Sequence, residues 1–183
     1  SEFASALLHV DASGVSSITY SGDVTAEGYR RVSKWADVRG SAYPFVQATK
    51  TPSVFTGAQL AYVNGDLLPG GANMMDFGAK GTTAPSMEFS SELSVREAFF
   101  VIKDAENVPL VNKCYNNGSA VNGNWQKNDY AHANVRGGIV EVDGLAIGYK
   151  DAYPAGVHVV HYRLTDNLAA TDIARTTKTY GGV

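Results

Sequence analysis

The sequence predicts an all-β protein, an antiparallel sandwich or jelly-roll-like barrel of about eight strands with one short helix. Two observations lead to this prediction. Short runs rich in Val, Ile, Tyr, Phe and Thr recur along the 183 residues, and Gly- or Asn-containing turn signals separate them. Strand-like and helix-like segments do not alternate regularly, as they would in a protein built around a parallel sheet.

The composition is that of a globular domain with few charges. Hydrophobic residues make up 44% and charged residues 18%, and the formal net charge is −3. Lys and Arg are scattered apart from Arg30, Arg31 and Lys34, so the basic stripe that nucleic acid requires is missing from the sequence. No apolar run approaches the roughly 18 residues of a membrane-spanning helix. We therefore expect neither nucleic-acid binding nor membrane insertion.

The length fits one domain. Residues 1–3 (Ser1-Glu2-Phe3) resemble the remnant of a cloning site, so we expect residues 4–183 to form a single β-rich domain excised from a longer protein. The single cysteine, Cys114, cannot form an intramolecular disulfide, and we expect it to be a small half-buried side chain.

Two elements are predicted in the first 40 residues. Residues 6–10 and 15–20 are strand-like runs on either side of a turn signal, which predicts a hairpin. Residues 24–38 give the one helix, centred on residues 26–36, because Tyr29, Val32 and Trp35 recur at helical spacing.

The middle of the chain predicts a second hairpin and a loop. Residues 58–68 form two apolar arms around Asn64-Gly65, a pair that suits a type I′ turn. Residues 69–85 have no period, and we expect a long loop there.

The second half contains the strongest strand signals. Residues 94–103 predict a buried strand, residues 138–149 a hairpin with its turn at Asp143-Gly144, and residues 156–164 an alternating strand. Weaker signals predict a strand within residues 109–115 and a helical turn at residues 168–173. Apolar positions on the predicted strands give the expected core: Leu8, Val10, Ile18, Val63, Phe99, Val101, Val140, Val142, Ile147, Val159 and Leu164.

The candidate catalytic groups form no diagnostic pattern. His158 and His161 are three residues apart in a strand-like run, which sends their rings to opposite faces and argues against a shared metal ion. The Gly-x-Ser-x-Gly motif of an activated serine does not occur. Five carboxylates in or near strands could pair for acid–base chemistry, but the signal is unspecific and we expect solvated surface acids instead: Glu88, Glu92, Glu97, Glu141 and Asp143.

Motifs for cofactors are also missing from the sequence. Residues 69–73 are Gly-rich but lack the Gly-Lys-Ser/Thr of a phosphate-binding loop, and no Cys/His cluster has zinc-site spacing. We therefore expect no catalytic residue, no metal and no cofactor.

The polar loop over residues 116–133, with Tyr115 before it, is the most suggestive binding surface. Asn amides supply donors and acceptors together, and aromatic rings offer flat apolar faces, which is the combination that sugars need. The same residues also suit a loop whose Asn side chains form turns and whose Trp covers the edge of the core. The expected ligand-binding residues are Tyr115, Asn117, Asn124, Trp125 and Tyr130.

Residues 62–71 (YVNGDLLPGG) and 138–144 (GIVEVDG), together with the low charge and the long loops, are the features on which a family resemblance rests. The chain resembles the protruding domain of a non-enveloped RNA virus capsid protein of the nodavirus-like or tetravirus-like insect viruses. The resemblance implies a domain that stands on a capsid shell, packs with copies of itself and presents loops to host receptors. It includes no diagnostic motif, so it assigns no functional residue.

We therefore expect a non-catalytic viral capsid surface domain, located on the virion surface, that forms a dimer or trimer and attaches to a host receptor or glycan. Its interface should be rich in aromatic residues and poor in charge, which favours Tyr43, Phe45, Phe55 and Tyr62. The alternatives are a secreted or extracellular lectin-type carbohydrate-binding module and a hydrolase. For a hydrolase, His132 is the residue to test.

Overall fold

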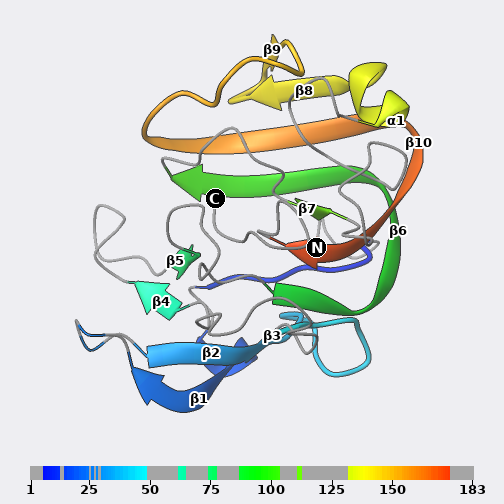
Figure 1. Ribbon diagram of the computed structural model, residues 1–183. Coiled ribbons are helices and arrows are strands. Elements are labelled where there is room, and N and C mark those ends of the chain that lie inside the picture. Colours follow the sequence, from blue (N-terminus) through cyan, green and yellow to red (C-terminus); the bar gives the residue numbers. More distant parts are fainter. Residues whose placement is uncertain are drawn as a thin grey trace.

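The computed structural model describes residues 6–12, 15–24, 26, 28, 30–48, 62–64, 74–77, 87–103, 111–112 and 132–173. This part of the chain is mostly antiparallel β-sheet with one short α-helix, so the predicted all-β class is confirmed. The strands form one open sheet that curls strongly, an arrangement consistent with an all-β sandwich (Figure 1).

The described residues form ten strands, one 3-10 turn and the helix. In chain order they are η1 (Val15–Ser17), β1 (Ile18–Val24), β2 (Arg30–Trp35), β3 (Val46–Ala48), β4 (Tyr62–Asn64), β5 (Met74–Asp76), β6 (Met87–Lys103), β7 (Val111–Asn112), α1 (Ala133–Arg136), β8 (Ile139–Val142), β9 (Leu145–Ile147) and β10 (Val157–Ile173).

The two long strands β6 and β10 form the centre of the sheet. They pair antiparallel from Val157 opposite Lys103 to Ile173 opposite Met87. The register shifts between Arg163 and Leu168, where β10 contains extra residues and both strands bend (Figure 1). A bulge increases local twist and bend, which explains why the sheet turns back on itself here.

The other strands add to this pair on both sides. β8 pairs with the first half of β10 and β9 with β8, whereas β7 pairs with the end of β10. On the other side, β3 joins the beginning of β6 to β2, and β2 also pairs with β1 and β4. Among the described strands, β5 and β9 are therefore the two ends of the β5-β4-β2-β3-β6-β10-β8-β9 order.

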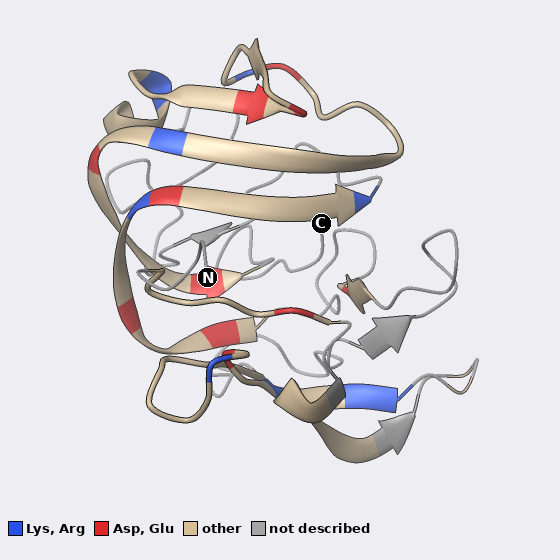
Figure 2. Cartoon of the chain, turned by 180° about the vertical axis from the view of Figure 1, so that it is seen from behind, with Lys and Arg blue, Asp and Glu red and all other residues tan. Residues whose placement is uncertain are grey.

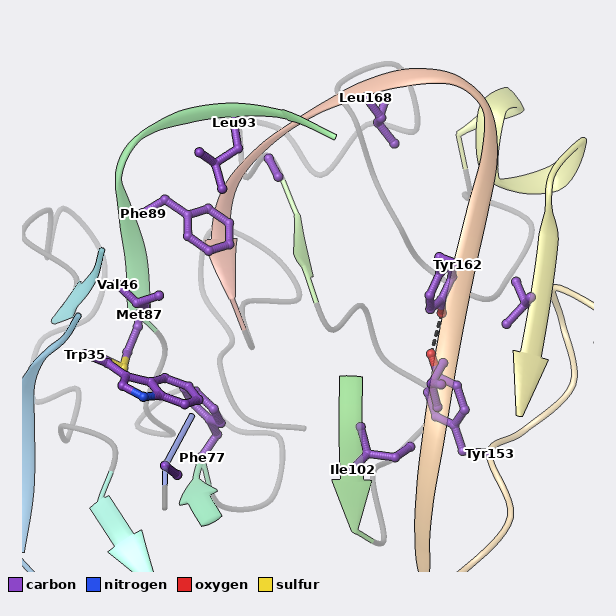
Figure 3. Packing of buried hydrophobic residues seen from close by; sticks show 14 of the residues in the cluster. Trp35, Val46, Phe77, Met87, Phe89, Leu93, Ile102, Tyr153, Tyr162 and Leu168 are labelled. Carbon is purple, nitrogen blue, oxygen red and sulfur yellow. Dashed lines mark hydrogen bonds between the residues drawn. The ribbon is translucent and has the colours of Figure 1, made fainter. Parts of the chain in front are cut away.

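The core fills the inside of the curled sheet. Trp35, Met87 and Phe77 gather beside β2 and β5, and the buried Tyr162 contacts Tyr153 through a hydrogen bond between the two hydroxyl groups (Figure 3). Burial raises the pKa of both phenols, and the contact between them raises the pKa of Tyr153 further while it opposes the rise at Tyr162, so both stay neutral. Of the residues expected in the core, Ile18, Val140, Val142 and Leu164 are buried, and Leu8, Val10 and Ile147 pack against the buried cluster.

The predicted helix over residues 24–38 is wrong. The described residues there include the end of β1, Gly28 at φ 90°, and β2. Tyr20 pairs with Val32 but Thr19 with Lys34, so Ser33 is the extra residue of a bulge. The bulge turns Val32 and Trp35 to the same buried face although they are three residues apart, and this spacing imitates a helix.

Three other predictions need correction. Residues 6–10 form no strand and are instead attached to residues 37–39, and residues 168–173 continue β10 instead of forming a helical turn. β4 pairs with β5, which lies inside the predicted loop over residues 69–85. Gly65 of the turn expected at Asn64-Gly65 and the side chain of Val63 lie outside the described residues. Of the predicted loop over residues 69–85, only residues 74–77 are described.

The strong signals of the second half are confirmed. Residues 94–103 lie in β6 as predicted, but the strand is not buried as expected, because half of these residues are exposed. Residues 157–164 begin β10, and the strand expected within residues 109–115 is β7. β8 and β9 form the hairpin predicted around Asp143 and Gly144, whose φ angles of 52° and 80° are those of a type I′ turn.

Candidate interaction surface

The three adjacent strands β6, β10 and β8 present one set of alternating side chains away from the core. Along β10, Val160, Tyr162 and Leu164 are buried, so the residues between them point outward. The register places the matching residues of β6 and β8 beside them. We call this side the outer face, and its members are Glu97, Phe99, Val101, Lys103, Ile139, Glu141, Val157, Val159, His161 and Arg163.

Five large apolar side chains are exposed on the outer face. Their exposed fractions are 58% for Phe99, 61% for Val101, 42% for Val157, 47% for Val159 and 37% for Ile139. Neither residues 98–102 of β6 nor residues 157–162 of β10 include Lys, Arg, Asp or Glu, and both stretches are tan in Figure 2. An antiparallel sheet with one solvated face normally alternates apolar and polar residues, so the apolar side chains of the outer face depart from this pattern.

This face corrects the predicted core. Phe99, Val101 and Val159 were expected inside, but the structure exposes them and buries their neighbours Val160 and Ile102. Apolar residues occupy both faces of β6 at residues 98–102, so the sequence pattern does not show which of them point inward.

His161 lies in the middle of the outer face between two carboxylates. Its Nδ1 is 2.8 Å from Oε2 of Glu141 on β8, and its Nε2 is 2.8 Å from Oε1 of Glu97 on β6. Both ring nitrogens can donate only when the imidazole carries its second proton. Phe99 stacks on the ring with the centroids 4.2 Å apart. The three strands are thus joined by a charged cluster with an aromatic cover.

A second histidine holds the β8–β9 turn against the start of β10. Nδ1 of His158 lies 2.7 Å from Oδ2 of Asp143, and its Nε2 lies 3.0 Å from the carbonyl oxygen of Ala155. The His158 ring, followed by the donated Val159 amide, holds the pKa of Asp143 below its ordinary value. These contacts fix the end of the hairpin beside the apolar centre of the outer face.

The register confirms that His158 and His161 point to opposite faces of β10, since His158 pairs with the buried Ile102 and His161 with the exposed Phe99. Within the described ranges, no group of three or more His, Cys, Asp or Glu is arranged to hold a metal ion. Of the carboxylates considered for acid–base chemistry, Glu97 and Glu141 are brought together, and each is bonded to the same imidazole.

The site predicted from the sequence cannot be placed. Tyr115, Asn117, Asn124, Trp125 and Tyr130 all lie outside the described residues, as does Cys114. His132 is described, and it caps α1 by accepting a hydrogen bond from the Asn134 amide at its Nδ1, 3.2 Å away. This contact gives His132 a structural role.

The aromatic interface candidates are partly described. The Arg39 guanidinium lies 3.8 Å from the ring centroid of Tyr43, and the Lys34 ammonium 4.0 Å from that of Phe45. The structure thus gives both rings a cation as a partner within the chain. Phe55 and the side chain of Tyr62 lie outside the described residues. The outer face is a surface that the sequence did not single out.

Comparison with protein-family models, with curated proteins and with solved structures finds no significant match for the chain. In the part of the chain that the structure describes, no helix is both long enough and apolar enough to cross a membrane. The functional proposal therefore rests on the residues of the outer face.

Proposed function

We propose that the chain is a non-catalytic self-association and attachment domain, of the kind that stands on the surface of a virus capsid, and that it contacts its neighbour through the outer face. The observation that supports this proposal is the group of five exposed apolar side chains on adjacent strands. The receptor or glycan contact that the capsid resemblance implies is proposed for residues 116–133, of which only residues 132 and 133 lie within the described ranges.

The apolar area suits a reversible contact. Fully burying a Val or Phe side chain contributes about 2 kcal/mol, and these five are about half exposed, so covering two such faces contributes about 10 kcal/mol. Association itself costs about 4–15 kcal/mol in lost freedom of motion. At the lower end of this cost, about 6 kcal/mol remains, which corresponds to a dissociation constant of about 40 μM, so we expect association only at micromolar concentrations and above.

The test is the mass in solution, measured by light scattering across a concentration series. We expect the wild type to move from monomer to dimer or trimer. Val101→Arg places a charge in the centre of the outer face and should weaken association at least about tenfold, since an unpaired charge buried in an interface is unfavourable.

Val38→Arg is the matched control. Val38 is an exposed valine (43%) outside the outer face, and the substitution introduces the same side chain as in Val101→Arg. This variant should therefore associate like the wild type. A wild-type chain that stays monomeric at every concentration, or equal effects of the two substitutions, would refute the proposal.

A further inference from the structure

We infer that the outer face binds a second copy of the same chain, sheet against sheet, about a two-fold axis that sets the two β6 strands antiparallel. This inference rests on the proposed self-association and specifies its geometry. Its basis is the order of charges along β6.

The outward residues of β6 are Glu97, Phe99, Val101 and Lys103, because the pairing with β10 is continuous over this stretch. A negative charge stands at one end, a positive charge at the other, and two exposed apolar side chains lie between them. When this row meets an antiparallel copy of itself, each Glu97 faces a Lys103 and each Phe99 faces a Val101. The row is therefore self-complementary, as an interface related by a two-fold axis must be.

The alternative two-fold arrangement is less favourable. Setting one β6 over the other in parallel would place Glu97 over Glu97 and Lys103 over Lys103. Like charges that face each other across an interface oppose association. Charge thus selects the antiparallel arrangement, while the apolar centre would provide affinity in either one.

The dimensions allow the contact. At about 3.4 Å per residue, Glu97 and Lys103 each lie about 10 Å along β6 from the midpoint at Phe100. Packed sheets lie about 10 Å apart and cross at about 30°, which displaces the two charged positions sideways by about 5 Å. A lysine side chain and a glutamate side chain together span that separation.

Glu97 can accept this additional donor. Its side chain is 52% exposed, and the hydrogen bond to His161 uses Oε1, so Oε2 can serve as an acceptor for a charged donor. Arg163 lies opposite Glu97 across the β6–β10 pair, at the same end of the outer face. In the antiparallel dimer, each end of the interface would therefore contain Glu97 and Arg163 of one copy and Lys103 of the other. A polar rim around an apolar centre is the usual arrangement of a protein interface.

The test exchanges the two charges between separate chains. Lys103→Glu alone should place Glu opposite Glu, and Glu97→Lys alone should place Lys opposite Lys, so each variant should dimerise at least about tenfold more weakly than the wild type. When the two variants are mixed, each introduced charge meets its opposite at both ends of the interface. A mixed dimer should therefore form with affinity close to that of the wild type, measured by light scattering at equal concentrations.

Two controls separate this effect from others. Glu97→Gln removes the charge without reversing it, so mixing it with Lys103→Glu should restore association less than Glu97→Lys does. Lys150→Glu changes an exposed lysine outside the outer face by the same charge and should leave association unchanged. Thermal unfolding followed by circular dichroism checks that each variant is folded, because Glu97 also contacts His161.

The outcomes distinguish the two proposals. The antiparallel arrangement is wrong if the single charge variants associate like the wild type, or if mixing them does not restore association. Self-association through the outer face still holds in either case, provided that Val101→Arg associates more weakly than the wild type. If the wild type does not self-associate at all, the proposed function fails, and the geometry fails with it.

Discussion

Replacing Asp37 with asparagine is expected to lower the free energy of unfolding by about 3 kcal/mol at neutral pH. The Asp37 side chain is fully buried, and its two carboxylate oxygens accept four hydrogen bonds. Three come from Arg39, through its backbone amide, Nε and Nη2, and the fourth comes from the His9 amide. An asparagine turns an NH2 group toward donors and removes the negative charge with which the guanidinium forms its ion pair.

The same residue predicts a pH dependence. Burial acts to raise the pKa of Asp37, but the hydrogen bonds from Arg39 and His9 together with the Arg39 charge outweigh it and lower the pKa from 3.8 to about 2. The folded protein thus binds this proton more weakly than the unfolded chain. Its contribution to stability is complete above about pH 4 and is lost as the pH falls toward 2, by about 2 kcal/mol.

Chemical denaturation of the wild type and Asp37→Asn at several pH values measures both effects. The difference between the two proteins should shrink as the pH falls from 4 to 2. Asp166→Asn is the control, because Asp166 is exposed and its carboxylate accepts only a local bond from the Asn167 amide, so its loss should be below about 0.5 kcal/mol. Equal losses for both variants would show that the Asp37 contacts are not stabilising.

Gly138→Ala is expected to lower the free energy of unfolding by about 3 kcal/mol. Gly138 lies where β8 begins, closely packed against β10. A Cβ atom there would overlap the carbonyl oxygen of Arg163 and lie 2.9 Å from the Asn134 carbonyl oxygen and 3.0 Å from Cα of Leu164. All three are backbone atoms, so β8 would have to move away from β10, and with it Glu141 away from His161.

The neighbouring Gly137→Ala is the matched control. A Cβ atom at Gly137 would meet the Thr165 methyl group at 3.1 Å, and that side chain can rotate away. The φ of −87° at Gly137 also suits alanine. The loss there should be below about 1 kcal/mol. Thermal unfolding compares the two variants, and similar transition temperatures would contradict the close packing at Gly138.

Local signals in the sequence predicted much of the fold. Asp143-Gly144 between two alternating arms gives a hairpin with a specific turn, and residues 94–103 are too rich in β-branched and aromatic residues for another element. The sequence did not predict β2, because this strand contains a bulge at Ser33. The bulge arises from the pairing of β2 with β1, and the periodicity of a single segment does not reveal such pairing. The spacing of Val32 and Trp35 then favoured a helix.

The sequence did not predict the outer face for a related reason. Residues 98–102 (AFFVI) are apolar at every position, so patterning alone could not decide which side chains point inward. Only the fold decides this: Phe100 meets the buried Tyr162 edge to face and Ile102 is buried in the core, whereas Phe99 and Val101 are exposed. The absence of alternation in residues 98–102 was nevertheless informative, because a strand with apolar side chains on both faces differs from a strand that has one solvated face. The Glu97–His161–Glu141 cluster joins three strands and could not be inferred without their register.

The most direct test of the outer face as an interface uses the unmodified protein. Methyl NMR resonances of Val101 and Val159 would be followed during dilution, with Val38 in the same sample as a reference. Self-association through the outer face predicts concentration-dependent shifts at Val101 and Val159 and constant shifts at Val38. Constant shifts at all three valines, or shifts at Val38 alone, would contradict it.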